Sequence, residues 1–586
     1  MSLNLLGQLN TFFFTPTKSF KDKNNVIWLS ASLCLSLLYP ILALSTVWGE
    51  SYWIQDDARQ HIFWMQKFVD PEIFNNDLIA KYYESISPWG IHLFYKFSFL
   101  LIKIEPLFLS KIIPTFLSVV TAFFAYKFAQ KILPLPFYGF VASVMLIQNF
   151  WMQDGFASAT GRAFGLPILI AFFGYLVEQS YWKVGFTILL MGLFYPPFIL
   201  IFIVILLLQL IDFKASFFKP SINKQKLIFV AINIIVCVIS LSPQILISSE
   251  FNQVITLQQA KQLPSFLPGG RTVFFDSDSF HFWFNGDRTG LRLSAALMPD
   301  FTYATFLFPF LWISRNFFIN KFSGRNLTIL FQISIAGILL FFAAHLLLFE
   351  LYLPSRYPFH TLRITFTFVS AYIVVFLLQE LFLRLQKTKW QATNFVMSTV
   401  LSFCLIMIIV KPLFLEWFPT HGYVIGQYPL SYDFLKTTPK DTLIASLDGE
   451  IDNIATFSYR SVYTAREYAI PYHFDYYQIL QKRTRNLIAA HYTTDTNQLK
   501  RFIRQSGVDL WLVSDRLFSA TYLRGDGRQN RWLQEFQPQT DQAIASLETS
   551  SQKTALQQVQ EQCTVFTERD IKLIDSQCIL RAEPKK

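Results

Sequence analysis

Near the start of the chain, two carboxylates, a guanidinium and an imidazole lie within six residues of one another. They belong to Asp56, Asp57, Arg59 and His61, and they follow the first long apolar run almost at once. A carboxylate can deprotonate an attacking hydroxyl as a general base. Aromatic residues precede the pair and an amphipathic stretch follows it, which favours a catalytic site over a solvated loop. The alternative is that one of the two aspartates caps the following helix.

The basic members of this cluster suit substrate contacts, and we assign Arg59 and His61 to substrate or phosphate binding. His61 lies one helical turn beyond Asp57, so the two side chains could pair or bind a metal ion. A histidine at such a position is more often an interface residue. A divalent metal is compatible with the sequence but not indicated by it, so we predict no cofactor.

Three later polar segments carry residues that suit the recognition of a phosphate group. Arginine binds phosphate oxygens in bidentate fashion and can stabilise a leaving phosphate. Arginines at a membrane edge also extend toward water for packing reasons alone, and the alternative for Asp154 is a structural role. The candidate binding residues in these segments are Asp154, Arg162, Arg271, Arg288, Arg356 and Tyr357.

The composition is that of a membrane protein. Of the 586 residues 53% are hydrophobic and only 15% are charged, against about a quarter in soluble domains. Apolar runs of about 20 residues recur along the chain. The first, 26–46, is too long and too late for a signal peptide and is predicted as a retained anchor. The net charge of +11 does not indicate nucleic-acid binding, because many basic residues, such as Arg315, Lys321 and Arg325, fall in short loops between apolar runs.

These loops orient the chain by the positive-inside rule. A cytoplasmic tail, 1–25, precedes a transmembrane part, 26–411, with about eleven helices. The outer loops 47–106 and 249–295 and the whole of 412–586 then lie outside the plasma (inner) membrane. The four polar segments named above all fall on this outer side.

Two apolar stretches do not read as simple spans. The stretch 91–104 is short, and we expect its helix to lie in the membrane interface. If it crossed the membrane instead, every later loop would change sides. Pro196 and Pro197 interrupt a longer run, so we expect two short spans, 184–195 and 197–212, with a turn between them.

The last part of the chain, 412–586, loses the long apolar runs and alternates strand-like with helical pieces. We predict a small extracytoplasmic α/β domain there. Cys563 and Cys578 lie in it, and export would allow them to form a disulfide. The fold class is therefore mainly α: a polytopic helical membrane protein with a small C-terminal α/β domain. The strand-like pieces are 442–445 and 510–513, and the helical ones are 477–490 and 496–505.

The acidic pair in the first outer loop resembles that of the GT-C superfamily of membrane glycosyltransferases. These enzymes use polyprenyl-phosphate-linked sugars and include protein mannosyltransferases, aminoarabinose transferases and oligosaccharyltransferases. The resemblance implies that an aspartate of the pair is the catalytic base and that later loops bind the lipid phosphate, with Arg356 and Tyr357 in the matching position. The usual Asp-Glu pair is Asp-Asp here, so Asp56 and Asp57 both stay candidates.

The sequence therefore predicts a glycosyltransferase that moves a hexosyl or pentosyl group, with inversion, from a polyprenyl-phosphate donor. The acceptor would be a glycan, lipid or protein at the outer face of the lipid bilayer, and no nucleic acid would take part. A transporter or flippase for a lipid-linked sugar is one alternative, although few ionisable residues fall inside the spans. A membrane scaffold with an exported binding domain is the other. It would be favoured if the four outer loops did not close over one cavity.

Overall fold

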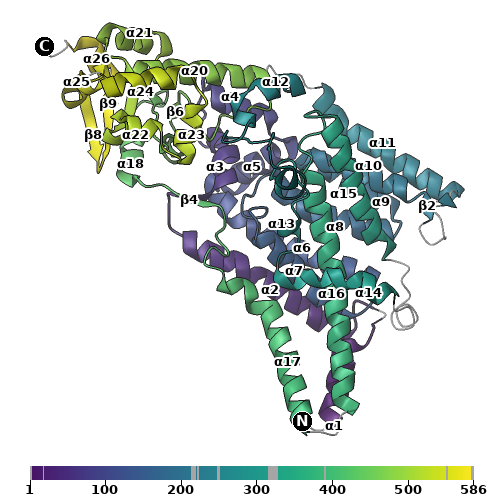
Figure 1. Cartoon of the computed structure of the whole chain (residues 1–586). Helices are drawn as coiled ribbons and strands as arrows, with labels where there is room; N and C mark the ends of the chain where they lie inside the picture. The colour runs from purple at the N-terminus through teal and green to yellow at the C-terminus, as the bar shows by residue number, and fades with distance from the viewer. Residues whose placement is uncertain are drawn as a thin grey trace.

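The computed structural model describes residues 3–17, 19–212, 219–220, 223–246, 251, 253–313, 327–387, 391–549 and 552–582. The basic loop residues Arg315, Lys321 and Arg325, which contributed to the predicted orientation, lie outside these ranges. Figure 1 shows a helical body that extends from α1 and α17 at one end to a C-terminal region at the other.

Five helices among the described residues are long and apolar enough to cross a membrane, by length and composition. They are α2 (Lys23–Val47), α6 (Pro106–Ile132), α11 (Lys224–Leu246), α15 (Thr328–Leu346) and α16 (Arg356–Lys387). Further helices pack between them: α5 (Trp89–Ile102), α7 (Pro136–Trp151), α8 (Gly161–Val177), α9 (Tyr181–Phe194), α10 (Ile199–Leu208) and α17 (Gln391–Val410). The tail also forms a helix, α1 (Leu3–Phe14). The predicted polytopic helical fold is confirmed.

The double proline divides one apolar run into two helices, as expected. α9 ends at Phe194, a 3-10 turn covers Pro196–Phe198, and α10 begins at Ile199. Glycine permits a close approach here, since a Cβ atom on Gly161 would lie 2.4 Å from the Phe194 carbonyl oxygen. The end of α9 therefore rests directly on the start of α8, which fixes the position of Tyr195.

Two other apolar stretches are irregular. The run 296–313 is divided into α13 (Leu293–Ala296), the 3-10 helix η5 (Asp300–Leu307) and α14 (Phe308–Ile313), because Pro299 cannot continue a helix. α5 has 14 residues and so spans about 21 Å, against about 30 Å for a bilayer core. Its place in the membrane interface remains a prediction.

The C-terminal region forms a five-stranded mixed sheet in the order β6-β5-β7-β9-β8. Its strands are β5 (Leu443–Ala445), β6 (Ser461–Val462), β7 (Leu510–Ser514), β8 (Thr564–Glu568) and β9 (Ile571–Asp575). β5 pairs in parallel with β6 and β7, and β9 pairs antiparallel with β7 and β8. The longest helices around it are α20 (Phe474–Tyr492), α21 (Thr496–Ser506) and α24 (Gln539–Thr549), with α18 (Pro429–Thr437), α19 (Ile451–Ser458) and α25 (Ala555–Cys563) nearby. The predicted α/β fold of this region is confirmed.

A short strand pair joins this region to the first loop. β1 (Trp53–Gln55) pairs antiparallel with β4 (Tyr423–Ile425), and the Asp56 amide donates to the Gly422 carbonyl at 2.8 Å. The helix that carries the acidic pair, α3 (Asp56–Ile62), begins directly after β1. The first loop continues with the 3-10 helix η1 (Phe63–Phe68) and α4 (Leu78–Ile86). The acidic pair therefore lies where the helical body meets the C-terminal region.

The predicted disulfide between Cys563 and Cys578 is present and joins the end of α25 to α26 (Ser576–Arg581). The two cysteines are 15 residues apart. The bond therefore closes a loop around β8 and β9, which form one edge of the sheet.

We expect that replacing Cys563 and Cys578 by serine lowers the free energy of unfolding of the C-terminal region by about 3 kcal/mol. The chain-entropy model gives this amount for a loop of that length. Thermal unfolding of the purified protein with and without reductant measures it. Replacing Cys34, a free cysteine of α2, is the control and should leave the midpoint unchanged. A double-serine variant as stable as the oxidised protein would contradict the expectation.

Candidate active site

α3 presents the acidic pair on its first turn. Gln55 caps this helix, because its side-chain oxygen accepts a hydrogen bond from the Ala58 amide at 3.1 Å. Neither Asp56 nor Asp57 is the capping residue, so that alternative is wrong. About a third of each carboxylate side chain is exposed, 37% for Asp56 and 32% for Asp57. Both carboxylates remain available to a bound molecule.

The four polar loops close over one cavity of about 1060 Å³. Asp56 and Asp57 come from the first loop and Arg162 from the start of α8. The long loop contributes Arg271 and Arg288, and Arg356 comes from the first residue of α16. The cavity is thus lined by side chains from each of the segments that the sequence singled out.

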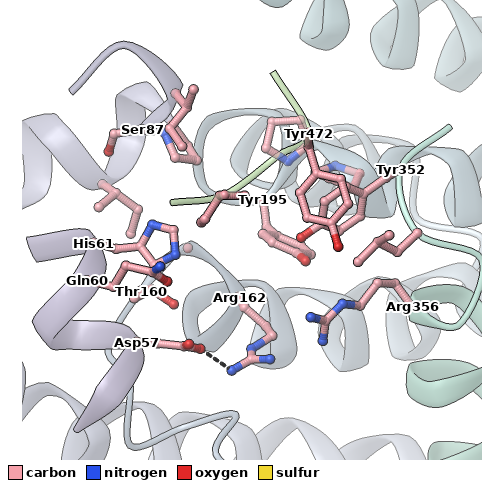
Figure 2. A pocket seen from close by; sticks show the side chains of 18 of the residues that line it. Asp57, Gln60, His61, Ser87, Thr160, Arg162, Tyr195, Tyr352, Arg356 and Tyr472 are labelled. Atoms are coloured by element: carbon pink, nitrogen blue, oxygen red, sulfur yellow. Dashed lines mark hydrogen bonds and ion pairs between the residues drawn. The ribbon is translucent and has the colours of Figure 1, made fainter. Parts of the chain in front are cut away.

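Arg162 links the two acidic segments of the helical body. Its Nη2 lies 2.5 Å from Asp57 Oδ2 and 3.2 Å from Asp154 Oδ1. Figure 2 shows the ion pair with Asp57 beside the cavity. Asp154 does not line the cavity and contacts Arg162 from behind. One guanidinium therefore contacts two carboxylates, which come from different segments of the chain.

Asp56 belongs to a second chain of charges. Arg59 Nη2 lies 2.6 Å from Asp56 Oδ1 and 3.4 Å from Glu467 Oε2. Arg59 does not line the cavity, and only 6% of it is exposed. The predicted substrate contact is thus a residue that lies behind Asp56 and holds it. Glu467 comes from the C-terminal region, and no sequence pattern pointed to it.

Burial raises the pKa values of both acids of the pair. The pKa of Asp56 rises to about 6 because of burial and the nearby Glu467 carboxylate, whereas the positive charge of Arg59 lowers it. Burial also raises the pKa of Asp57, although Arg162 opposes this. The pKa of Asp154 falls to about 2, chiefly because of Arg162. The pair therefore has a higher proton affinity than Asp154, as a general base needs.

Arg356 lies on the opposite wall without a carboxylate partner. No acid within the described ranges lies within ion-pair distance of it, and its Nε is buried without a hydrogen bond. Figure 2 shows its guanidinium next to that of Arg162, with Tyr195 and Tyr352 above. Tyr352 has a positive φ of 65°, which is rare for a bulky residue and concentrates at functional sites. This wall offers positive charge and phenol groups to an anion.

Of the other predicted binding residues, some line the cavity and one does not. His61 lines the cavity with its ring edge-on to Tyr83, and burial lowers its pKa to about 4. Arg288 also lines it and donates to the Tyr472 hydroxyl at 2.9 Å. Tyr357 does not, since it is 1% exposed and its hydroxyl donates to the Leu351 carbonyl. Within the described residues, no group of three or more His, Cys, Asp or Glu is arranged to hold a metal ion.

The cavity also has an apolar wall. It consists of side chains on α4, α5, α9 and α11, at the side of the helical body. Several of these residues also face outward, as Trp89 and Ile239 are 59% and 57% exposed. The apolar lining residues are Ile86, Trp89, Leu189, Leu193, Ile239 and Pro243. The polar site is thus continuous with a surface suited to a lipid tail.

Several residues of the cavity were not found from the sequence. Tyr195 was hidden in an apolar run, and the only signal near it was the double proline. Tyr352 precedes the predicted Arg356 by four residues, but Tyr357 drew the assignment instead. Arg466 and Glu467 come from the C-terminal region, and no local pattern connects them with the first loop.

We expect Arg162→Met to lower the free energy of unfolding by about 2 kcal/mol, because it leaves two partly exposed carboxylates without the guanidinium that both of them contact. A second change, Asp57→Asn, should restore part of the loss. Thermal unfolding in detergent measures both. Lys440→Met is the control, because Lys440 pairs with Asp70 and Glu72 at an exposed surface, where an ion pair contributes little to stability. An Arg162→Met protein with the wild-type midpoint would refute the pairing.

Comparisons with known proteins give a fold and no family. No family model matches the chain, and no curated protein sequence matches it. Three solved structures of an oligosaccharyltransferase from Archaeoglobus fulgidus are similar. The one tethered with an acceptor peptide containing the NVT sequon has a TM-score of 0.52 at 9% identity and covers 89% of this chain and 72% of that chain.

The complex of this oligosaccharyltransferase, AglB, with an inhibitory peptide and a dolichol-phosphate has a TM-score of 0.51 at 12% identity, with coverage of 89% and 72%. The apo form has a TM-score of 0.50 at 10% identity, with coverage of 88% and 73%. At such identities the likeness concerns the fold. The chain has the GT-C fold of these membrane enzymes, as its acidic pair and loop arrangement predicted.

Proposed function

We propose that this protein is a membrane glycosyltransferase that moves a sugar from a polyprenyl-phosphate donor to a hydroxyl or amide acceptor. The observation that carries the proposal is the single cavity over which the four polar loops close. It joins two carboxylates of raised pKa, arginines on a facing wall, and an apolar side. A scaffold would need no such convergence. The GT-C fold supports the same activity, since one structure of that fold holds a dolichol-phosphate.

The two walls suggest separate duties. Arg356, which has no carboxylate partner in the part of the chain that the structure describes, binds the donor phosphate together with Arg162. Tyr195 and Tyr352 donate hydrogen bonds to the phosphate oxygens. The apolar wall takes the first isoprene units of the lipid. The sugar then lies between the apolar wall and the acidic pair, close enough to His61 for a hydrogen bond. The neutral imidazole of His61 suits a hydrogen bond to a sugar hydroxyl.

The transfer is a single displacement at the anomeric carbon. The acceptor group loses its proton to an aspartate of the pair, and its oxygen or nitrogen forms a bond to the anomeric carbon. The bond from that carbon to the phosphate oxygen breaks, and the electron pair leaves with the phosphate. The arginines stabilise the charge that develops on the leaving phosphate. Attack opposite the leaving group inverts the configuration of the anomeric carbon.

The acceptor is a glycan, a lipid or a protein, and the transferred group is a hexose or a pentose. The orientation follows from the basic loops, so the reaction takes place at the extracytoplasmic face of the plasma membrane. Residues 412–586 form a domain on that side. The oxidised Cys563–Cys578 pair supports this orientation, because disulfides persist in oxidising compartments.

Transfer from a panel of radiolabelled polyprenyl-phosphate monosaccharides in proteoliposomes tests the proposal. We expect the Asp56→Asn, Asp57→Asn double variant to lose at least about a thousandfold in kcat, because it removes the base and part of its electrostatic frame. Tyr357→Phe is the matched control, since its hydroxyl bonds the backbone outside the cavity. Full activity of the double variant would exclude the acidic pair as the site.

We expect Arg356→Gln to raise the donor KM about tenfold or more, because an arginine–phosphate contact is a strong, charge-assisted interaction. The acceptor KM should stay unchanged. Initial rates at varied donor and acceptor concentrations separate the two constants. Arg516→Gln is the control, because Arg516 is a half-exposed arginine of the C-terminal region that pairs with the buried Asp448 and does not line the cavity. Equal effects of both substitutions on the donor KM would remove Arg356 from the phosphate site.

The pH profile of kcat should rise with pH and level off above about 6 if Asp56 is the base. Its pKa is raised to about 6, and a base acts only when it is deprotonated. Activity should therefore fall as the pH drops through this value. Rates from pH 4 to 8, with the stability of the protein checked at each pH, provide the profile. A flat profile down to pH 4 would contradict an aspartate base of raised pKa.

A further inference from the structure

We infer that Glu467 is a positioning residue of the acidic pair, which the C-terminal region supplies and which acts through Arg59. The inference rests on the proposed function and adds a residue to it that does not touch the reacting atoms. It gives the C-terminal region a defined part in the chemistry.

The Glu467 carboxylate lies at the junction of three arginines. Its Oε2 is 3.4 Å from Arg59 Nη2 and 3.5 Å from Arg466 Nη1, and its Oε1 is 3.6 Å from Arg271 Nη2. Only 13% of the side chain is exposed. The arginines come from α3, from the long loop and from the C-terminal region itself. One buried carboxylate therefore joins the three parts of the chain that surround the acidic pair.

The backbone around Glu467 is also fixed. Its amide donates to Asp452 Oδ1 at 2.9 Å, and its carbonyl accepts from Gln60 Nε2. Gln60 is on α3, between Arg59 and His61. α3 and the Glu467 segment are thus connected by both backbone and side chain, so a shift of one moves the other.

Arg59 transmits this connection to Asp56. Its Nη2 holds Asp56 Oδ1 at 2.6 Å, and its Nη1 donates to Asn453 Oδ1 at 2.6 Å. Its carbonyl accepts from the Thr456 hydroxyl at 2.9 Å. Glu467 and Asn453 therefore hold the guanidinium in one orientation. Without them, a long and flexible side chain would have to support Asp56 alone.

The charge of Glu467 has a second effect on the pair. The charged groups that face the two carboxylates are Arg59, Arg162, Arg356, Asp154 and Glu467. Among them Glu467 raises the pKa of both Asp56 and Asp57. Its neutralisation would lower both values, whichever aspartate is the base. The acidic limb of the pH profile would then move to lower pH.

The variants Glu467→Gln and Glu467→Asp test the inference in full-length protein. Proteoliposomes receive the polyprenyl-phosphate sugar that the wild-type protein uses, and kcat is measured from pH 4 to 8. Glu467→Gln should lower kcat up to about a hundredfold and move the acidic limb to lower pH, at an unchanged donor KM. Glu467→Asp keeps the charge, so its limb should stay at the wild-type pH.

Glu568→Gln is the matched control. Glu568 is a buried carboxylate of the same region, where it accepts from the amide and hydroxyl of Ser431 at 2.7 and 2.8 Å. Its loss should affect stability without moving the limb. If Glu467→Gln behaves as Glu568→Gln does, with the wild-type limb, Glu467 is a structural residue only and the inference is wrong.

A stability measurement keeps the inference testable without activity. In a double-mutant cycle on the unfolding midpoint, Glu467→Gln and Asp56→Asn should be non-additive, because Arg59 links the two carboxylates. Additive effects would overturn the inference. A wild-type protein that transfers no sugar would refute the proposed function, and the cycle would still decide whether Glu467 supports Asp56.

Discussion

The side chains of Asp56 and Asp57 are only about a third exposed. Two neighbouring negative charges that are mostly removed from water require positively charged partners. Burial weakens the hydration of a charge and strengthens its attraction to a neighbouring one. Two arginines meet this need from opposite directions. Arg162 neutralises Asp57 together with Asp154, and Arg59 neutralises Asp56 together with Glu467. Both aspartates start the same short helix, so α3 is where two ion-pair chains meet.

This arrangement explains why the loops converge. Each arginine belongs to a different part of the chain, and each must be held in place by a rigid structural element. Arg162 stands on the first turn of α8, which contacts the end of α9 closely at Gly161. Arg59 is enclosed by the C-terminal region. Arg356 starts the long helix α16 and has no ion-pair partner among the described residues, so it leaves the opposite wall with positive charge that a bound anion would neutralise.

Much of this could be predicted from residue types and spacing. The apolar runs predicted the helical body, and the strand-like pieces at 442–445 and 510–513 correspond to β5 and β7. Asp56, Asp57, Arg162, Arg271, Arg288 and Arg356 do line one cavity. Tyr357 does not, because a helix turns by about 100° per residue and Arg356 and its neighbour therefore face different sides. Glu467 could not be predicted, since only tertiary contacts bring it to α3.

The pairing of β1 with β4 bears on how the protein matures. Arg59 and Asn453 are separated by 394 residues, so the acidic helix must wait for most of the chain before its neighbours exist. Closing so long a loop is slow compared with forming the helices between its ends. During synthesis, the carboxylates would be present early but unsupported. Support for the acidic pair is thereby deferred until the C-terminal region has folded, which makes assembly of the site a late event in the life of the chain.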